Sequence, residues 1–135
     1  MQQTNYISQS VLDEYATKQP DFGPLGEGIF QRTYSRILPH GGKETWWDLC
    51  KRVTNGNIAF NPSRLIENEA DELFKSLFNF NIIPGGRMIF NTGTPKNLVS
   101  NCFTNGPGKS LSEHFSVAFE LLLQGAGVFN GPVTA

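Results

Sequence analysis

Hydrophobic residues recur at helical spacing through the first two-thirds of the chain. In the segment KETWWDLCKRVTNG, four of them share one helix face at i, i+3, i+4 and i+7: Trp46, Leu49, Cys50 and Val53. Asn55 and Gly56 are typical of a helix end, so we expect the helix to stop there. Cys50 is predicted to be a core residue, because a thiol within an apolar stripe is poorly placed to ionise.

A second, longer stripe follows in residues 61–81. Asn61 can cap a helix there and Pro62 suits its first position, so one helix is predicted from this point. The apolar residues of the stripe face polar neighbours: Ile66, Ala70, Leu73, Phe74, Leu77 and Phe78. A stripe this rich in aromatic residues indicates packing in a core or an interface.

Two shorter helices are predicted before residue 40. Ser10 is a candidate N-cap with Asp13 three residues later, and Pro20 closes that segment. A further helix is expected from about Pro24, although the glycines that follow are poor helix formers. The tripeptide HGG at residues 40–42 then predicts a turn.

The pattern changes after residue 83. Residues 98–104 are short, partly β-branched and bounded by turn residues, which favours a strand. Ser110 and Glu113 form a capping box for a final helix that should end at Gly125. The face of this helix that is expected to point inward carries Phe115, Ala118, Phe119 and Leu122.

The order of these elements predicts an α/β fold. Residues 1–83 form an N-terminal helical region, and residues 84–135 begin a strand–helix unit. Such a unit needs a neighbouring strand to cover its edge and to receive the helix. Only about ten residues follow the final helix, so we expect the α/β part to be incomplete at its C-terminus.

Composition and charge narrow the possible functions. Hydrophobic residues at 39% and charged residues at 17% of the 135 residues are typical of an ordinary globular protein. Lys+Arg 11 against Asp+Glu 12 give a net charge of -1, which disfavours nucleic acid as a partner. The sequence shows neither a run of about 18 apolar residues nor a signal peptide, so we expect no membrane partner and a cytoplasmic location.

Potential metal ligands are few and scattered. Cys50 and Cys102 lack the paired spacing of a zinc site, and no metal site is predicted. His40 lies beside two glycines and His114 lies in the first turn of the last helix. Neither histidine has a partner at ligand or triad spacing, so both are expected on the surface.

The segment PGGRMIFNTGTPKNLVSNCF combines groups that suit an anion and a redox reaction. Gly85 and Gly86 permit a backbone path that exposes N–H groups, and the guanidinium of Arg87 adds a fork of five donors, which together suit a phosphate or carboxylate. The alternative is a plain turn with a solvated charge. Cys102 follows about fifteen residues later, either as a buried strand cysteine or as a thiol that shares a pocket with the anion.

With these residues assembled, the chain resembles the adenosylcobalamin-dependent (class II) ribonucleotide reductases, in particular the monomeric ribonucleoside-triphosphate reductases. Three blocks carry the resemblance, in order: PLGEGIFQRTYSRILPHGGKETWWDLCKRVTNGN, PGGRMIFNTGT with SNCF, and FELLLQGAGV. The resemblance extends over about residues 22–128. It implies that residues 84–135 begin the ten-stranded α/β barrel of the family.

The resemblance also implies roles for five residues. Cys102 matches the first-strand cysteine that gives up electrons as the ribose 2'-hydroxyl is removed, and that forms a disulfide with a cysteine much later in the chain. Gly86 and Arg87 match the turn that approaches the substrate phosphates. Ser100 and Asn101 match positions that line the region of the substrate ribose and phosphates. Cys50 has no counterpart.

The same resemblance implies partners and a cofactor. The substrate would be a ribonucleoside triphosphate, and a thioredoxin-like dithiol would restore the reduced cysteines. In the family, a thiyl radical generated by cobalt–carbon homolysis of adenosylcobalamin abstracts the 3'-hydrogen. The thiyl cysteine, the partner cysteine and the cobalamin-binding surface lie beyond residue 135, so this fragment is expected to hold no cofactor and to be inactive without a complementary reductase fragment.

Three other functions remain open at the sequence level. A class I large subunit is disfavoured, because the N-terminus shows no regulatory ATP-binding cone and the RTYSR block looks more like the monomeric class II proteins. A stand-alone interaction or nucleotide-binding module would tolerate alanine at Cys102. A nonfunctional truncated product would be poorly soluble, because the strand around Cys102 would have an unpaired edge.

Overall fold

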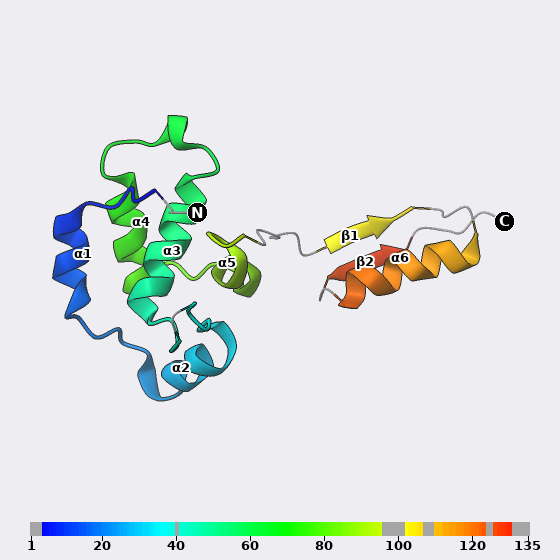
Figure 1. Cartoon of the computed structure of the whole chain (residues 1–135), viewed down its shortest axis with the longest axis horizontal. Helices are drawn as coiled ribbons and strands as arrows, with labels where there is room; N and C mark the ends of the chain where they lie inside the picture. The colour runs from blue at the N-terminus through cyan, green and yellow to red at the C-terminus, as the bar shows by residue number, and fades with distance from the viewer. Residues whose placement is uncertain (1–3, 40, 96–101, 107–109, 124–125, 131–135) are drawn as a thin grey trace. The chain divides into compact units, whose positions relative to one another are not determined.

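A computed structural model describes residues 4–39, 41–95, 102–106, 110–123 and 126–130 (Figure 1). The chain divides into two compact units, Met1–Leu98 and Val99–Ala135. The first unit is helical, and the second contains a helix and two paired strands. None of the helices in the described ranges is both long and apolar enough to cross a membrane.

The first unit is built from five α-helices within its described residues. They are α1 (Gln9–Ala16), α2 (Gly23–Ile29), α3 (Trp46–Ile58), α4 (Glu69–Phe78) and α5 (Gly86–Asn91). A π-helical turn at Phe30–Tyr34 continues α2, and a 3-10 turn at Pro62–Arg64 lies between α3 and α4. The turn predicted at residues 40–42 is confirmed for its two glycines, because Gly41 and Gly42 both take positive φ angles and the Gly41 N–H donates to the Leu38 carbonyl.

Helix α3 begins as the pattern predicts but ends later. Thr45 and Asp48 form a reciprocal capping box at its N-terminus. The helix then runs through Asn55 and Gly56 as far as Ile58, so the predicted stop is wrong.

Tertiary contacts explain why these two residues do not end the helix. The buried Asn55 side chain accepts a hydrogen bond from the Tyr6 N–H at 2.8 Å. Gly56 is buried against the backbone of Gly93, where a Cβ would come within 2.4 Å of the Gly93 Cα. Asn55 and Gly56 are residue types common at helix ends, but here they lie inside the helix because they make these contacts with Tyr6 and Gly93.

Helix α4 starts later than predicted. Residues 62–64 form only a 3-10 turn, and Asn68 takes a left-handed φ of 63° directly before the helix. The Glu69 carboxylate accepts a hydrogen bond from the Ile66 N–H at 3.0 Å, which holds the preceding loop outside the helix. The prediction for Ile66 is therefore wrong, because its side chain is 70% exposed. The rest of the predicted stripe is buried or half-buried: Ala70, Leu73, Phe74, Leu77 and Phe78.

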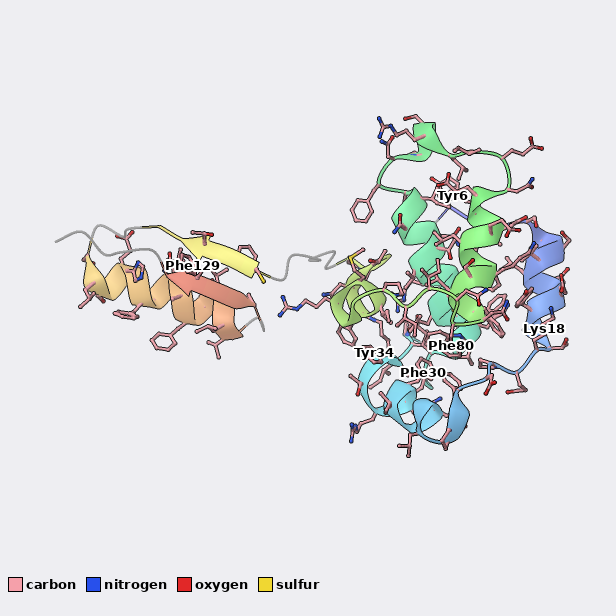
Figure 2. All side chains as sticks on the ribbon, turned by 180° about the vertical axis from the view of Figure 1, so that it is seen from behind. Tyr6, Lys18, Phe30, Tyr34, Phe80 and Phe129 are labelled. Atoms are coloured by element: carbon pink, nitrogen blue, oxygen red, sulfur yellow. The ribbon has the colours of Figure 1, made fainter. Side chains whose placement is uncertain are left out.

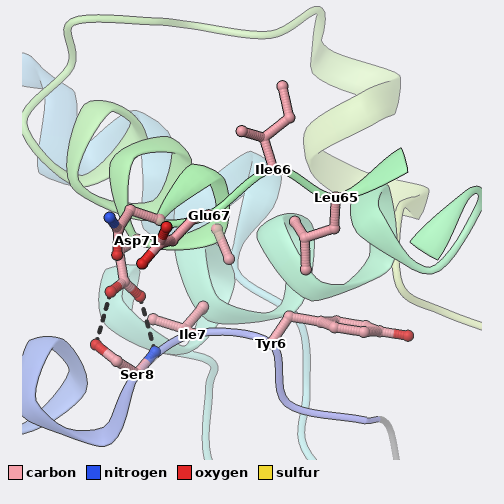
Figure 3. Close-up of a pocket in the computed structure, with 9 residues that line it drawn as sticks. Tyr6, Ile7, Ser8, Leu65, Ile66, Glu67 and Asp71 are labelled. Atoms are coloured by element: carbon pink, nitrogen blue, oxygen red, sulfur yellow. Dashed lines mark hydrogen bonds between the residues drawn. The ribbon is translucent and has the colours of Figure 1, made fainter. Parts of the chain in front are cut away.

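A distant carboxylate fixes the N-terminus of α1 (Figure 3). The N-cap is Ser8 and not Ser10, so the predicted cap is two residues late. The Asp71 carboxylate accepts both the backbone N–H and the hydroxyl of Ser8 at 2.7 Å. This contact joins α1 to α4 at the edge of a cavity of about 330 Å³.

Aromatic rings hold the first unit together. Tyr15 of α1 packs edge-on against Phe74 and Phe78 of α4, with ring centroids 5.7 and 5.0 Å apart. At the start of α3, Trp46 stacks on Phe80 with centroids 4.8 Å apart. Such ring pairs add stability beyond the area they bury.

A cleft opens beside Trp46 and Phe80. Phe30, Tyr34 and Phe80 lie close together near α2 (Figure 2) and line a largely apolar cavity of about 350 Å³.

The second unit is a strand–helix–strand unit. Strand β1 (Cys102–Asn105) pairs in parallel with β2 (Gly127–Asn130), and α6 (Leu111–Leu123) connects them. The sequence analysis predicted the first strand and the helix, and the structure adds the strand β2 after them. Four residues beside a glycine turn are too few to show a period, so the sequence pattern does not reveal β2. Residues 98–101 of the predicted first strand lie outside the described residues.

Of the face of α6 that was predicted to point inward, only Ala118 is buried, and His114 is buried beside it. His114 and Ala118 are 1% and 3% exposed, so the surface location predicted for His114 is wrong. Phe115, Phe119 and Leu122 are instead 44%, 61% and 48% exposed. The ring of His114 can enter the interior because its Nδ1 has a hydrogen-bond partner there, the Gly106 carbonyl.

The predicted start of α6 is correct in one respect. The Ser110 hydroxyl accepts the Glu113 N–H at 3.2 Å, as the capping box requires. The predicted helix end at Gly125 and the predicted surface residue His40 both lie outside the described residues.

The boundary between the two compact units falls between residues 98 and 99 of the sequence. Helix α5 therefore belongs to the helical unit, although residues 84–95 were assigned by sequence to the beginning of the barrel. The boundary predicted at residue 83 separates the helical region from the start of the barrel, and it stays a prediction.

Candidate functional site

The thiol of Cys102 is accessible. Cys102 is the first residue of β1, it is exposed, and its partner in the register is Gly127, which has no side chain. The sequence left open whether Cys102 is a buried strand cysteine or a thiol in a pocket. Because Cys102 is exposed, it is not a buried cysteine in the described unit. A regular strand also limits the backbone motion of the residue that carries the sulfur atom.

A polar cluster that the sequence does not reveal lies at the other end of β1. The Asn105 side chain donates to the His114 carbonyl at 2.9 Å, and the His114 Nδ1 donates to the Gly106 carbonyl at 3.0 Å. Both side chains are buried. The cluster joins the end of β1 to the first turn of α6, so it fixes the strand on which Cys102 lies.

The glycine segment of the first unit starts a helix and does not form a turn with left-handed residues. Gly85 is the N-cap of α5 with an extended backbone, and Gly86 is the first helical residue. Neither has a positive φ angle. A Cβ at Gly86 would lie 3.1 Å from the Tyr34 hydroxyl, so packing explains this glycine. Arg87 follows in the first turn and is half-buried.

Two predicted site residues cannot be placed. Ser100 and Asn101 lie outside the described residues, so their assignment stays a prediction. Cys102 belongs to the second unit, whereas Gly86 and Arg87 belong to the first. The substrate-binding roles of Gly86 and Arg87 likewise stay predictions.

Sequence reasoning missed the charged pair that fixes α5. The Arg52 guanidinium forms an ion pair with Glu44, and the side chains of both residues are largely buried. The same guanidinium donates to the carbonyls of Ile89 and Thr92, which are 37 and 40 residues away in sequence. Sequence spacing gives no link between positions this far apart. From the sequence, Arg52 beside Lys51 in a helix is expected to be an ordinary solvent-exposed charge.

The two cysteines differ in chemistry. Burial raises the pKa of the Cys50 thiol above its ordinary value, the nearby Glu44 carboxylate adds to this effect, and Arg52 opposes it. Cys50 is fully buried in the core of the first unit, which confirms its predicted structural role. Of the two thiols, Cys102 alone is accessible to a reactant.

The described part of the chain has no group of three or more His, Cys, Asp or Glu side chains that could hold a metal ion. What it does contain is an accessible thiol on a strand and, in the other unit, a short helix that begins with a glycine and an arginine. The thiol can take part in redox chemistry, and the arginine can bind a phosphate.

Comparison with known proteins identifies a family. The family model of the ribonucleotide reductase alpha domain matches residues 7–94. A putative adenosylcobalamin-dependent ribonucleoside-triphosphate reductase of Mycobacterium phage D29 is 38% identical over 110 residues, which cover 79% of this chain and 16% of the relative. The adenosylcobalamin-dependent ribonucleoside-triphosphate reductase of Lactobacillus leichmannii is 28% identical over 157 residues, covering 90% of this chain and 21% of the relative.

A solved structure shows the same arrangement. The crystal structure of a B12-dependent (class II) ribonucleotide reductase matches with a TM-score of 0.73 and 26% identity, covering 94% of this chain and 23% of that chain. The helical first unit and the parallel strand pair match the N-terminal part of that fold, which confirms the predicted α/β class. The chain spans between 16% and 23% of the length of these relatives.

Proposed function

The chain belongs to the ribonucleotide reductase alpha-domain family, and from this premise we propose that it supplies the N-terminal part of an adenosylcobalamin-dependent ribonucleoside-triphosphate reductase. The complete enzyme would convert ribonucleoside triphosphates to 2'-deoxyribonucleoside triphosphates. The observation that carries the proposal is the accessible thiol of Cys102 on the first strand of a parallel pair.

The proposed role of Cys102 is to supply reducing electrons. The C2'–OH bond of the ribose breaks and a C2'–H bond forms, while the hydroxyl leaves as water. Two electrons and two protons come from Cys102 and a second cysteine outside this chain, which end as a disulfide. An external dithiol protein of the thioredoxin kind then reduces the disulfide. A strand suits this role, because the thiol must stay oriented toward the sugar.

Substrate binding is assigned to Gly86, Arg87, Ser100 and Asn101. Arginine binds phosphate oxygens through a planar fork of donors, and Gly86 directly precedes Arg87 at the start of α5. Because Arg87 is a half-buried residue in a helix, its side chain would lose less conformational entropy on binding than one on a free loop. We assign the substrate phosphates to Gly86 and Arg87, and the region of the ribose and phosphates to Ser100 and Asn101.

Adenosylcobalamin, the cofactor named for the relatives, would be held by the rest of the enzyme. This assignment follows the resemblance, in which the cobalamin-binding surface lies beyond residue 135. We also infer a cytoplasmic location, since a redox-active dithiol needs a reducing compartment.

The test is an activity assay of a complete reductase in which this chain is joined to, or co-expressed with, a reductase segment that supplies the rest of the barrel. Reduction of a ribonucleoside triphosphate is followed with adenosylcobalamin and a dithiol reductant. We expect Cys102→Ala to abolish turnover, and the matched variant Cys50→Ala to retain it once folding is verified by circular dichroism. Full activity of Cys102→Ala would refute the proposed role.

The alternatives are not favoured by the comparisons. Both relatives described above are named as adenosylcobalamin-dependent enzymes and the solved structure is a class II reductase, which argues against a class I large subunit. A stand-alone nucleotide-binding module would bind a triphosphate equally well with alanine at Cys102, without any reductase activity.

A further inference from the structure

A buried ion pair lies between α3 and the loop that precedes it. The Arg52 Nε lies 2.7 Å from one carboxylate oxygen of Glu44, and an Nη lies 2.9 Å from the other. The side chains are 12% and 4% exposed. The Glu44 backbone is fixed as well, because its N–H donates to the Arg36 carbonyl at 2.7 Å. Glu44 therefore holds the guanidinium of Arg52 in one orientation.

The remaining donors of Arg52 bind the C-terminal end of α5. One Nη donates to the Thr92 carbonyl and the other to the Ile89 carbonyl at 3.1 Å. A second cation adds to this contact, since Arg36 donates to the Phe90 carbonyl at 2.8 Å. The last carbonyls of a helix have no partner within the helix and form the negative end of its dipole, so two guanidinium groups suit them.

Helix α5 depends on such contacts because it has only six residues. An isolated helix of this length does not form in water, because too few hydrogen bonds offset the cost of nucleation. Its position is therefore set by what binds it from outside. Buried ion pairs contribute little net stability compared with apolar packing, so the arrangement is better explained by the geometry it imposes.

We propose that Arg52, oriented by Glu44, is a positioning residue for the phosphate-binding Arg87. Arg52 touches no substrate. It anchors the last turn of α5, and through this helix it fixes the first turn, where Gly86 and Arg87 lie. This inference rests on the proposed function, which assigns the substrate phosphates to Arg87.

The first experiment measures the position of α5 directly, in the full 135-residue chain and without any activity. Amide hydrogen exchange is recorded for Ile89 and Thr92, whose N–H groups donate to Gly85 and Met88 within this short segment. Arg52→Lys keeps the charge but loses the fork, so we expect exchange at these two amides to accelerate by about tenfold. The matched control is Arg64→Lys, at an exposed arginine in the 3-10 turn. Unchanged exchange in Arg52→Lys would overturn the proposal.

The second experiment uses the complete reductase and a double-mutant cycle. Arg52→Lys should raise the KM for the ribonucleoside triphosphate by about tenfold with little change in kcat, because the loss is in binding and not in chemistry. In an enzyme that already carries Arg87→Ala, the same Arg52→Lys change should have no further effect on KM. An equal effect in both backgrounds would show a merely structural role and overturn the proposal.

Two further outcomes separate this inference from the proposed function. If Arg87→Ala leaves KM unchanged, the assignment of the phosphates to Arg87 fails, whatever the exchange data show. If Arg87→Ala raises KM while Arg52→Lys does not, the phosphate site stands and the positioning role of Arg52 is refuted. Should Arg52→Lys fail to fold, Glu44→Gln replaces it, since this variant keeps the shape of the pair and removes only the charge that orients Arg52.

Discussion

Replacing Gly56 by alanine tests the closest contact between α3 and the segment after α5. Gly56 lies inside α3 and is buried. A Cβ added there would lie 2.4 Å from both the Cα and the N of Gly93, and 3.0 Å from the Thr92 side chain. Carbon atoms in good contact lie about 3.5–4.0 Å apart. The atoms of Gly93 belong to the backbone, so no side-chain rotation can relieve the clash.

Two effects of opposite sign decide the outcome. In the interior of an exposed helix, alanine is favoured over glycine by about 1 kcal/mol. Against this, α3 and the segment at Gly93 would have to separate by about 1 Å to restore ordinary contact distances. Overpacking of a tight interior costs about 1–3 kcal/mol, and here the displaced segment also carries the carbonyl of Thr92 that Arg52 binds. We therefore expect a net loss of about 1–2 kcal/mol.

Thermal and urea unfolding, followed by circular dichroism, measure this change. Each kcal/mol should lower the Tm of a unit of this size by roughly 4–8 °C. The matched control is Gly28→Ala in α2, where no atom lies within 4 Å of the added Cβ and φ is not positive. This variant should gain about 0.4–1 kcal/mol. If Gly56→Ala is stabilised in the same way as Gly28→Ala, the close approach to Gly93 is wrong.

Three further predictions follow from the core and the thiols. In the native chain, a thiol reagent such as 5,5'-dithiobis(2-nitrobenzoate) should modify Cys102 rapidly and Cys50 only after unfolding; fast release of two equivalents would contradict the burial of Cys50. Burial raises the pKa of Cys50, so above pH ~9 the unfolded chain loses this proton and the folded chain keeps it. The stabilisation that comes from keeping this thiol protonated is therefore fully present below pH ~9. Above it, the free energy of unfolding should fall by up to about 1.4 kcal/mol for each pH unit, and Cys50→Ala should lack this pH dependence. Phe74→Ala should lower the free energy of unfolding by about 3–5 kcal/mol, because this ring is fully buried between α1 and α3, whereas the half-exposed Phe60 should tolerate alanine at a cost below about 1 kcal/mol; equal losses in urea titrations would argue against this core.

Local chemistry alone was enough to predict much of the helical unit. The apolar stripe from Leu49 to Val53 and the one from Ala70 to Phe78 are helical and buried, because period 3.6 requires one face of each helix to leave water. The hydroxyl of Ser110 also caps α6 as the sequence predicts, since a capping box involves only neighbouring residues. Interactions between residues that lie within about four positions of one another can therefore be predicted from the sequence.

Contacts between distant residues decided the rest. The N-cap of α1 is Ser8 and not the predicted Ser10, because the carboxylate of Asp71 binds Ser8. Helix α3 extends beyond its predicted end at Gly56, because Gly93 packs against this glycine. The inward face of α6 turned to His114 because Asn105 and Gly106 supply hydrogen-bond partners inside the unit.

The candidate site shows the same division between sequence and structure. The residue types near Gly86, Arg87 and Cys102 are enough to suggest anion binding and thiol chemistry from the sequence. That the thiol is exposed on a parallel strand, and that α5 is held by Arg52, depends on residues up to 40 positions apart. Which chemical groups are available can therefore be read from the amino-acid order. Which of them are accessible, and what holds them in place, follows from the fold, because burial and hydrogen-bond partners arise from segments that are distant in sequence.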